Sequence, residues 1–161
     1  MSADLPSASF KELYERHFDM VYRICYMYLK NKTDTEDAVH NTFLKLLQTE
    51  KTFQNAEHEK AWLIRVSSNV CKNILKSRVR TYLINDDEKD IPVTDYHDET
   101  LMAVLRLPDN LKTTVYLYYY EGYDSIQIGK ILHITSSAVR NRLKRAKEQL
   151  KDILTDKEDN K

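Results

Sequence analysis

A short stretch near the end of the printed sequence carries side chains of the types that read DNA bases. Arginine and lysine can donate hydrogen bonds to O6 and N7 of guanine, and asparagine suits the N6 and N7 edge of adenine. Four such residues fall within one stretch of six: Arg140, Asn141, Lys144 and Arg145. Arg142 lies nearer the flank of this set, where contact with a phosphate is more natural. The alternative is a solvated basic helix on a helix bundle that binds no DNA.

The spacing of apolar residues predicts that this stretch is a helix with one buried side. These residues recur at steps of four and three, which places them on a single helix face: Val139, Leu143, Ala146 and Leu150. The basic and amide side chains then point outward. Ser136 or Ser137 begins the helix, and Ser137 and Arg140 lie at the end that would enter a major groove.

A short helix and a tight turn are predicted directly before the basic helix. Asp124 can cap a helix, and Gln127 three residues later completes a capping box. We therefore expect a helix over 125–132, a turn over 133–135 and then the basic helix. Together they form a helix-turn-helix, in which the first helix braces the second and the second lays its N-terminal half in the major groove.

One more helical segment precedes this motif. It begins near 101–105, Pro108 is suited to the first turn of its main helix, and Gly122 is suited to that helix's end. Between them lies a cluster of tyrosines, Tyr116 and 118–120. We expect most of these rings in the core and in helix–helix contacts.

The first half of the chain predicts three helices. Apolar residues follow helical spacing over 10–29 and again over 34–47, and Asp34 or Thr35 can cap the second of these helices. A polar loop and a third long helix follow, over 51–59 and from Lys60 to about Arg80.

The zero net charge, with 25 basic and 25 acidic residues, hides a segmented distribution. Six basic residues and no acid occur over 60–80, whereas seven acids and one lysine occur over 86–99. The acidic segment contains Pro92 and lacks periodicity, so we expect a flexible linker over 85–100. Two basic blocks on either side of it suggest two surfaces that face polyanions. Two solvated helix faces would give the same pattern.

Composition restricts the fold and the function classes. The 42% hydrophobic and 31% charged residues are typical of a globular protein, and two glycines and three prolines are few for a β-rich fold or a phosphate loop. No apolar run approaches the ~20 residues that span a bilayer, and the first residues lack the pattern of a signal peptide. The isolated Cys25 and Cys71 predict neither a metal site nor a disulfide. The sequence shows no nucleophile–base pair and no cofactor motif, so we do not expect an enzyme. We expect an all-α protein of two small helical domains, 1–84 and 101–157.

Two parts of the chain resemble one family of bacterial proteins. The segment 107–150 resembles the fourth sigma region of the extracytoplasmic-function sigma factors of RNA polymerase. The matching positions are Leu107-Pro108, 118–122, Ile128, Leu132, Ile134, Val139, 142–143 and 145–146. The first half resembles the second sigma region in "DTEDAVHNTFLKLL" and "KAWLIRVSSNVCKNILKSR". The resemblance covers nearly the whole chain, and it implies a cytoplasmic, non-catalytic subunit that needs no cofactor and directs transcription initiation.

The resemblance also implies where the partners bind. Core polymerase would contact the helix over 34–47 through its β′ clamp helices, at Asp37, Val39, His40, Asn41, Phe43 and Leu47. Packing in the core is the alternative for Val39 and Leu47. One or two rings of the tyrosine cluster would be left for the β flap. Family members are commonly held inactive by an anti-sigma factor, which would be a further partner.

Promoter DNA would be bound at two places. The −35 element would be read as a duplex by Ser136, Ser137, Arg140, Asn141, Arg142, Lys144 and Arg145. The loop 53–59 and the helix after it match the element that captures an unstacked base of the melted −10 strand. Its candidates are Asn55, Glu57, His58, Lys60, Arg65, Asn69, Lys72, Asn73 and Lys76. A positive helix beside a polar loop suits single-stranded DNA. Trp62 could stack on DNA, although a core role is favoured, and Asn69 could instead satisfy a buried backbone group.

Some positions depart from the family pattern. His133 stands where glycine is usual in the turn, and Gly129 stands where alanine is usual, which should loosen the bracing helix by roughly 0.5–1 kcal/mol. His40, Asn41 and Asn73 also differ from the common residues, which bears on the strength of partner binding.

Other functions remain open on the sequence alone. An autonomous helix-turn-helix regulator would bind DNA without polymerase, usually as a dimer. An adaptor would bind polymerase without touching DNA. The acidic linker could also mask the basic blocks in the free protein.

Overall fold

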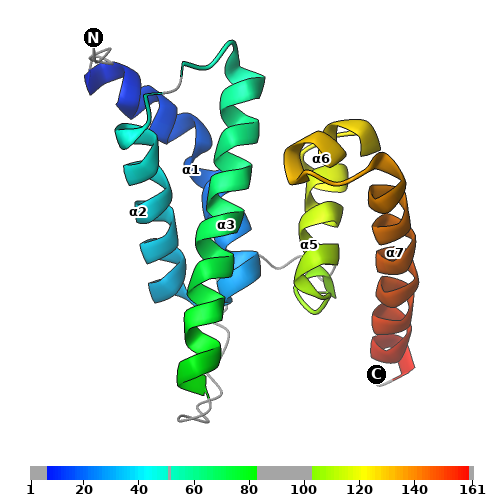
Figure 1. Cartoon of the computed structure of the whole chain (residues 1–161). Coiled ribbons are helices and arrows are strands. Elements are labelled where there is room, and N and C mark those ends of the chain that lie inside the picture. Colours follow the sequence, from blue (N-terminus) through cyan, green and yellow to red (C-terminus); the bar gives the residue numbers. More distant parts are fainter. Residues whose placement is uncertain (1–6, 51, 83–102, 160–161) are drawn as a thin grey trace. The chain divides into compact units, whose positions relative to one another are not determined.

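The computed structural model describes residues 7–50, 52–82 and 103–159, and all regular structure in these ranges is helical (Figure 1). The all-α prediction is therefore confirmed. The chain divides into two units, residues 1–92 and 93–161, and each is considered by itself. The predicted linker over 85–100 lies outside the described residues.

The first unit is a bundle of three helices, α1 (Ser7–Leu29), α2 (Lys32–Gln48) and α3 (Ala56–Tyr82), each of which packs on the other two (Figure 1). Each helix contributes an apolar stripe to a shared core. Residues with no exposed surface come from all three helices: Val21, Ile24, Cys25, Ala38, Leu63, Ile64 and Cys71. Burial of these side chains is the main force that holds the bundle together.

The turn between α1 and α2 is tighter than the sequence pattern indicated. The residue that caps α2 is Asn31, not Asp34 or Thr35, so the helix begins earlier than predicted. The Oδ1 of Asn31 accepts a hydrogen bond from the Asp34 N–H at 2.9 Å, and its Nδ2 donates to the Leu29 carbonyl at 3.0 Å. Lys30 completes the turn with a left-handed backbone, φ 58°. Asparagine is a strong capping residue, and here it also closes the preceding helix.

Helix α3 also begins earlier than predicted, at Ala56 instead of Lys60. Asn55 caps it, because its Oδ1 accepts from the His58 N–H at 2.8 Å and its carbonyl accepts from the Glu59 N–H at 3.2 Å. Glu57 and His58, which were placed on a loop, therefore lie in the first helical turn. The polar loop is correspondingly shorter.

The second unit contains α5 (Asp109–Val115), the π-helix η1 (Tyr116–Tyr120), α6 (Ser125–Leu132) and α7 (Ser136–Asp159). Both α5 and α6 pack against α7 (Figure 1). The core between α5 and α7 consists of Val104, Leu107, Leu111, Val115 and Ala146, with Leu143, Leu150 and Ile153 partly buried against it. The stripe predicted for the basic helix is thus the side that faces the core.

The π-helix η1 turns the tyrosine cluster outward. Its backbone closes with the Glu121 N–H donating to the Tyr116 carbonyl five residues earlier, at 3.2 Å. Tyr116 is 1% exposed, whereas the next three tyrosines, Tyr118, Tyr119 and Tyr120, are 41%, 63% and 44% exposed. The prediction that most of these rings lie in the core is wrong. Short π-helical turns are frequently found at functional sites, and the helical periodicity of the sequence did not predict this one.

The helix-turn-helix has the predicted form. Asp124 and Gln127 make both hydrogen bonds of the capping box, α6 ends at Leu132, and His133 has a left-handed backbone at φ 58°. Gly129 has a role that its helix propensity does not reveal. A Cβ at this position would lie 2.7 Å from the Ile134 carbonyl oxygen, so a glycine is what lets the turn pass so close to α6. Gly129 therefore has two effects: it loosens the helix, as expected, and it allows the close approach of the turn.

Candidate functional site

The outward face of α7 is basic from its first turn onward. Val139 and Ala146 have no exposed surface, which directs the side chains on the opposite side of the helix to solvent. Exposed residues on this face are Ser137, Arg140, Asn141, Lys144 and Arg145, whereas Ser136 and Arg142 are half-buried at its edge. Within the described ranges, Arg140, Lys144 and Arg145 have no acidic partner. This is the arrangement predicted for a helix that enters a DNA groove, and charges without partners leave the full electrostatic attraction to a phosphate backbone.

The start of α7 is held by the turn before it. The Thr135 hydroxyl accepts a hydrogen bond from the Ala138 N–H at 3.1 Å and thus caps the helix. The Ile134 N–H donates to the Gly129 carbonyl at 2.9 Å, which fixes the turn to α6. The first turn of α7, with Ser137 and Arg140, is therefore fixed in direction relative to the bracing helix.

A second polar face runs along α3. Steps of four, three and four residues connect Arg65, Asn69, Lys72 and Lys76, so these side chains form one stripe. His58 lies seven residues before Arg65 and begins the same stripe, and Asn73 lies beside it. Asn69 is exposed, which excludes the alternative that it satisfies a buried backbone group. Lys60 is two residues from His58 and so falls outside the stripe, although the sequence pattern grouped them.

The turn at the start of this stripe is ordered by its own side chains. The imidazole Nδ1 of His58 accepts from the Gln54 N–H at 3.2 Å. The Phe53 ring lies edge-on to both His58 and Trp62, with centroids 5.5 Å and 5.6 Å away. Trp62 is 8% exposed, so its role is in the core, as the sequence favoured. Asn55 uses its Oδ1 as the helix cap, and its Nδ2 remains the group that could donate to a ligand.

An aromatic groove of about 610 Å³ lies between α1 and α2. Five of the six residues predicted to bind polymerase line it: Asp37, Val39, His40, Phe43 and Leu47; Asn41 does not. Val39 and Phe43 are buried and contribute mainly to packing. Leu47 is 55% exposed, so the core alternative is wrong for this residue.

One wall of this groove was not predicted from the sequence. It consists of aromatic side chains at every fourth position of α1: Phe10, Tyr14, Phe18 and Tyr22. Tyr14 lies 4.7 Å from Phe43 between ring centroids and is still 38% exposed. Glu36 and Asp37 place carboxylates at the edge of the groove. The spacing of four was visible in the sequence, but it was used there only to predict a helix.

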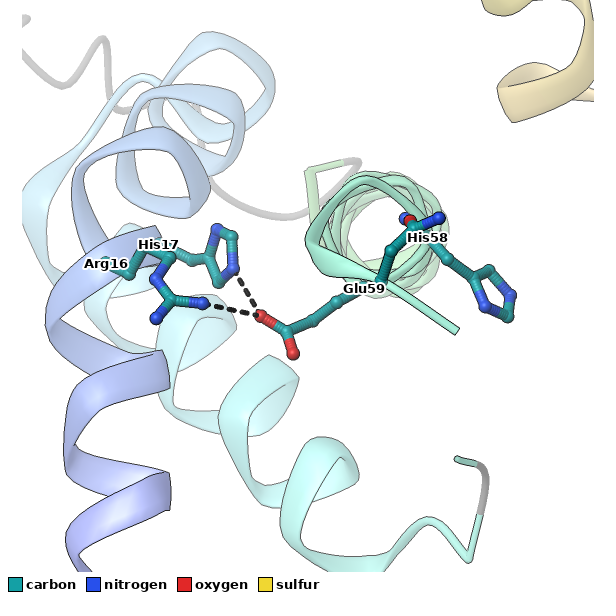
Figure 2. A network of polar contacts seen from close by, with 5 residues as sticks. Arg16, His17, His58 and Glu59 are labelled. Carbon is teal, nitrogen blue, oxygen red and sulfur yellow. Dashed lines mark hydrogen bonds and ion pairs between the residues drawn. The ribbon is translucent and has the colours of Figure 1, made fainter. Parts of the chain in front are cut away.

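A buried polar pair joins α1 to α3, and neither residue stood out in the sequence (Figure 2). The Nε2 of His17 lies 2.6 Å from Oε1 of Glu59, and Nη1 of Arg16 lies 3.9 Å from the same oxygen. His17 and Glu59 are 5% and 8% exposed. Glu59 comes between two candidate residues, His58 and Lys60, but it faces inward.

No metal site is found in the part of the chain that the structure covers. There, no cluster of three or more His, Cys, Asp or Glu residues could hold a metal ion. Cys25 and Cys71 are both buried, and they form no disulfide. Of the helices described, none has the length and apolar character to cross a membrane.

Two sequence families match this chain. Residues 13–81 match Sigma-70 region 2, and residues 97–150 match Sigma-70, region 4. The ECF RNA polymerase sigma factor SigE of Mycolicibacterium smegmatis is 31% identical over 159 residues, which cover 91% of this chain and 62% of that protein. The ECF RNA polymerase sigma factor SigW of Bacillus subtilis is 22% identical over 168 residues, covering 92% and 90%.

The fold has a relative among solved structures. The sigma factor RpoE of Bartonella quintana, determined in complex with the anti-sigma factor NepR, superposes with a TM-score of 0.73. The superposition covers 91% of this chain and 96% of that one at 18% sequence identity. At this level of identity the likeness establishes a shared fold.

Proposed function

Because the chain belongs to the extracytoplasmic-function sigma factors, which direct RNA polymerase to promoters, we propose that its three surfaces divide that task. The groove between α1 and α2 binds core polymerase, the α3 stripe holds the melted −10 strand, and α7 reads the −35 duplex. The first two surfaces belong to a domain at 1–84 and the third to a domain at 101–157. The division of the chain into two units supports this assignment.

The observation that carries the proposal is the pair of polar faces on α3 and α7, one in each unit. The α7 face exposes two arginines, a lysine and an asparagine, which suits direct reading of base edges in a major groove. The α3 stripe combines spaced cations with amides and an ordered turn, which suits a single strand with one extruded base. A protein that only bound duplex DNA would have no use for the second.

The polymerase contact is assigned to the aromatic groove. Exposed apolar surface rimmed by carboxylates is typical of a protein–protein interface. Tyr14, Leu44 and Leu47 supply the exposed apolar part, and Asp37 and His40 the polar part. The tyrosines that η1 turns outward in the second unit offer a separate aromatic patch, which we assign to the β flap. An anti-sigma factor would compete for one or both surfaces.

This proposal has no catalytic step. Strand opening would draw its energy from binding the unstacked −10 strand, and the chain would act in the cytoplasm because its partner polymerase is there. No cofactor is needed.

Run-off transcription with purified core polymerase and a promoter library tests the proposal. We expect promoter-specific transcripts only when the chain and core polymerase are both present. Loss of those transcripts in an Arg140→Ala/Arg145→Ala variant that still binds core polymerase would support direct reading of the −35 element. Tight, polymerase-independent binding of the same promoters by a dimer of the chain would refute the proposal in favour of an autonomous regulator.

A further inference from the structure

His17 and Glu59 are polar residues at positions where the helices otherwise present apolar side chains. On α1, Leu13, His17 and Ile24 fall at the same helical phase, and both flanking residues are buried. On α3, Glu59, Leu63 and Val70 share a phase in the same way. The two helices therefore bring His17 and Glu59, 42 residues apart in sequence, together among apolar neighbours.

The contact between them is short and charge-assisted. An N–H to carboxylate hydrogen bond of 2.6 Å is at the strong end of the range, and both partners are largely removed from water. Arg16 adds a positive group from the solvent side, with its Nη1 3.9 Å from the same carboxylate oxygen. In Figure 2 the side chains of Arg16 and His17 reach from α1 toward the Glu59 carboxylate. A pair of this kind restricts the orientation of two helices more than apolar packing does, because it tolerates little sliding or rotation.

The place of this pair on α3 gives it a consequence. The Glu59 N–H is bound to the carbonyl of Asn55, the cap residue of the helix. His58, one residue earlier, points to the opposite side of α3 from the Glu59 carboxylate (Figure 2). Rotation of this turn about the helix axis would therefore move both His58 and Asn55.

Buried ion pairs are weak evidence for stability. Replacing one with apolar residues of similar volume is often neutral or stabilising, so stability alone does not account for such a pair. The apolar core of the first unit is already supplied by residues of all three helices.

We propose that His17 and Glu59 are positioning residues for capture of the −10 strand, which fix the first turn of α3 so that Asn55 and His58 meet the extruded base. This inference rests on the proposed role of the α3 stripe. The pair itself does not touch DNA in this view. It sets the direction in which the touching residues point.

The test uses the holoenzyme, reconstituted from core polymerase and the full chain, with His17→Leu/Glu59→Leu and Glu59→Gln variants. Glu59→Gln keeps a hydrogen-bond acceptor for His17. The matched control is Glu15→Gln, which removes an exposed pair with Lys11 on the same helix α1. Three quantities are measured: thermal unfolding of the chain, affinity for core polymerase, and affinity of the holoenzyme for a single-stranded −10 oligonucleotide.

We expect the double leucine variant to fold and bind core polymerase normally while its affinity for the −10 oligonucleotide falls at least about tenfold, as small misplacements of binding groups do. Glu59→Gln should recover part of that loss, and Glu15→Gln should lose nothing. If the double variant folds and binds the oligonucleotide as the wild type does, the inference is overturned. If it does not fold, Glu59→Gln decides: unchanged unfolding with weaker capture supports positioning, and unchanged capture rejects it.

Two further variants separate this inference from the proposed function. Lys72→Ala and His58→Ala alter the α3 stripe directly. Weaker capture in these variants with normal capture in the double leucine variant would reject the positioning role alone. Normal capture in all of them would reject the role of the stripe, and the inference with it.

Discussion

The carbonyl oxygen of Ile134 lies so close to Gly129 that a side-chain carbon there would come within 2.7 Å of it. Residue 129 is in the bracing helix and residue 134 is in the turn, so this contact sets how closely the two elements of the DNA-reading motif approach. The atom in the way belongs to the backbone and cannot move without moving the turn. Helix propensity therefore favours alanine at position 129, whereas the packing of the turn requires glycine.

The first prediction concerns this contact. Gly129→Ala should destabilise the second unit by about 1–3 kcal/mol, because the strain of overpacking exceeds the gain in helix propensity. Chemical denaturation of the full chain measures the change. Lys130→Ala, an exposed change on the same helix, should be neutral within about 0.5 kcal/mol. A stabilising Gly129→Ala would show that the turn is free to shift.

The second prediction concerns the end of α1. Lys30 has a left-handed backbone and donates its N–H to the Tyr26 carbonyl at 2.8 Å. Lys30→Gly should therefore stabilise the first unit by about 0.5–1 kcal/mol, because glycine adopts this conformation without steric cost. Lys45→Gly, within α2, should instead lower the free energy of unfolding by about 1 kcal/mol. Changes of opposite sign for the two variants in the same denaturation assay would confirm the left-handed backbone of Lys30.

The third prediction separates base reading from general attraction on α7. Arg140→Ala and Arg145→Ala should each weaken promoter binding by about 1–3 kcal/mol and alter preference at one −35 position. Lys151→Ala, later on the same helix, should weaken binding less and without change in preference. Holoenzyme binding to a set of −35 variants, repeated at two salt concentrations, distinguishes the two effects. Uniform losses across all sequences would assign the arginines to phosphates.

The fourth prediction divides the groove residues by burial. Leu47→Asp should weaken binding to core polymerase without changing the unfolding temperature, because Leu47 is 55% exposed. Val39→Ala should destabilise the chain by about 2 kcal/mol, because Val39 is 4% exposed and its removal leaves a cavity. Tyr14→Ala tests the α1 wall and should also weaken polymerase binding. Undiminished binding in both the Leu47 and Tyr14 variants would place the polymerase contact elsewhere.

The fifth prediction separates the two roles assigned to Asn55. Asn55→Ala removes the helix cap and should lower stability by about 1 kcal/mol. Asn55→Asp keeps an oxygen that accepts from the His58 N–H, so stability should be retained. Its added negative charge and lost N–H donor should nevertheless weaken capture of a −10 oligonucleotide by the holoenzyme. Equal capture by the aspartate variant and the wild type would limit Asn55 to capping.

Local chemistry explains which elements could be predicted from the sequence. The bounds of α6 were predicted correctly because Asp124 and Gln127 form a complete capping box within four residues. The starts of α2 and α3 were predicted three or four residues late. In both cases an asparagine caps the helix earlier in the chain, and the choice of cap depends on how the preceding chain approaches.

Contacts between distant residues explain what could not be predicted. The His17–Glu59 pair joins positions 42 residues apart. Each residue alone is only a polar interruption of an apolar stripe, so the sequence does not indicate the pairing. The α1 wall of the groove has the spacing of a core stripe, and only the packing of α2 shows that part of it stays exposed. The π-helical turn arises because a backbone N–H donates to the carbonyl five residues earlier instead of four. The amino-acid composition of the segment does not indicate this shift.

Helix α1 has a consequence for how this chain can change over evolutionary time. Tyr14 and Phe18 line the groove, while His17, between them in sequence, reaches across to Glu59. A shift of α1 that accommodated a new protein partner on one side would carry His17 with it on the other. Mutations at the two sides of this helix are therefore not independent, and variation at one is expected to be accompanied by variation at the other.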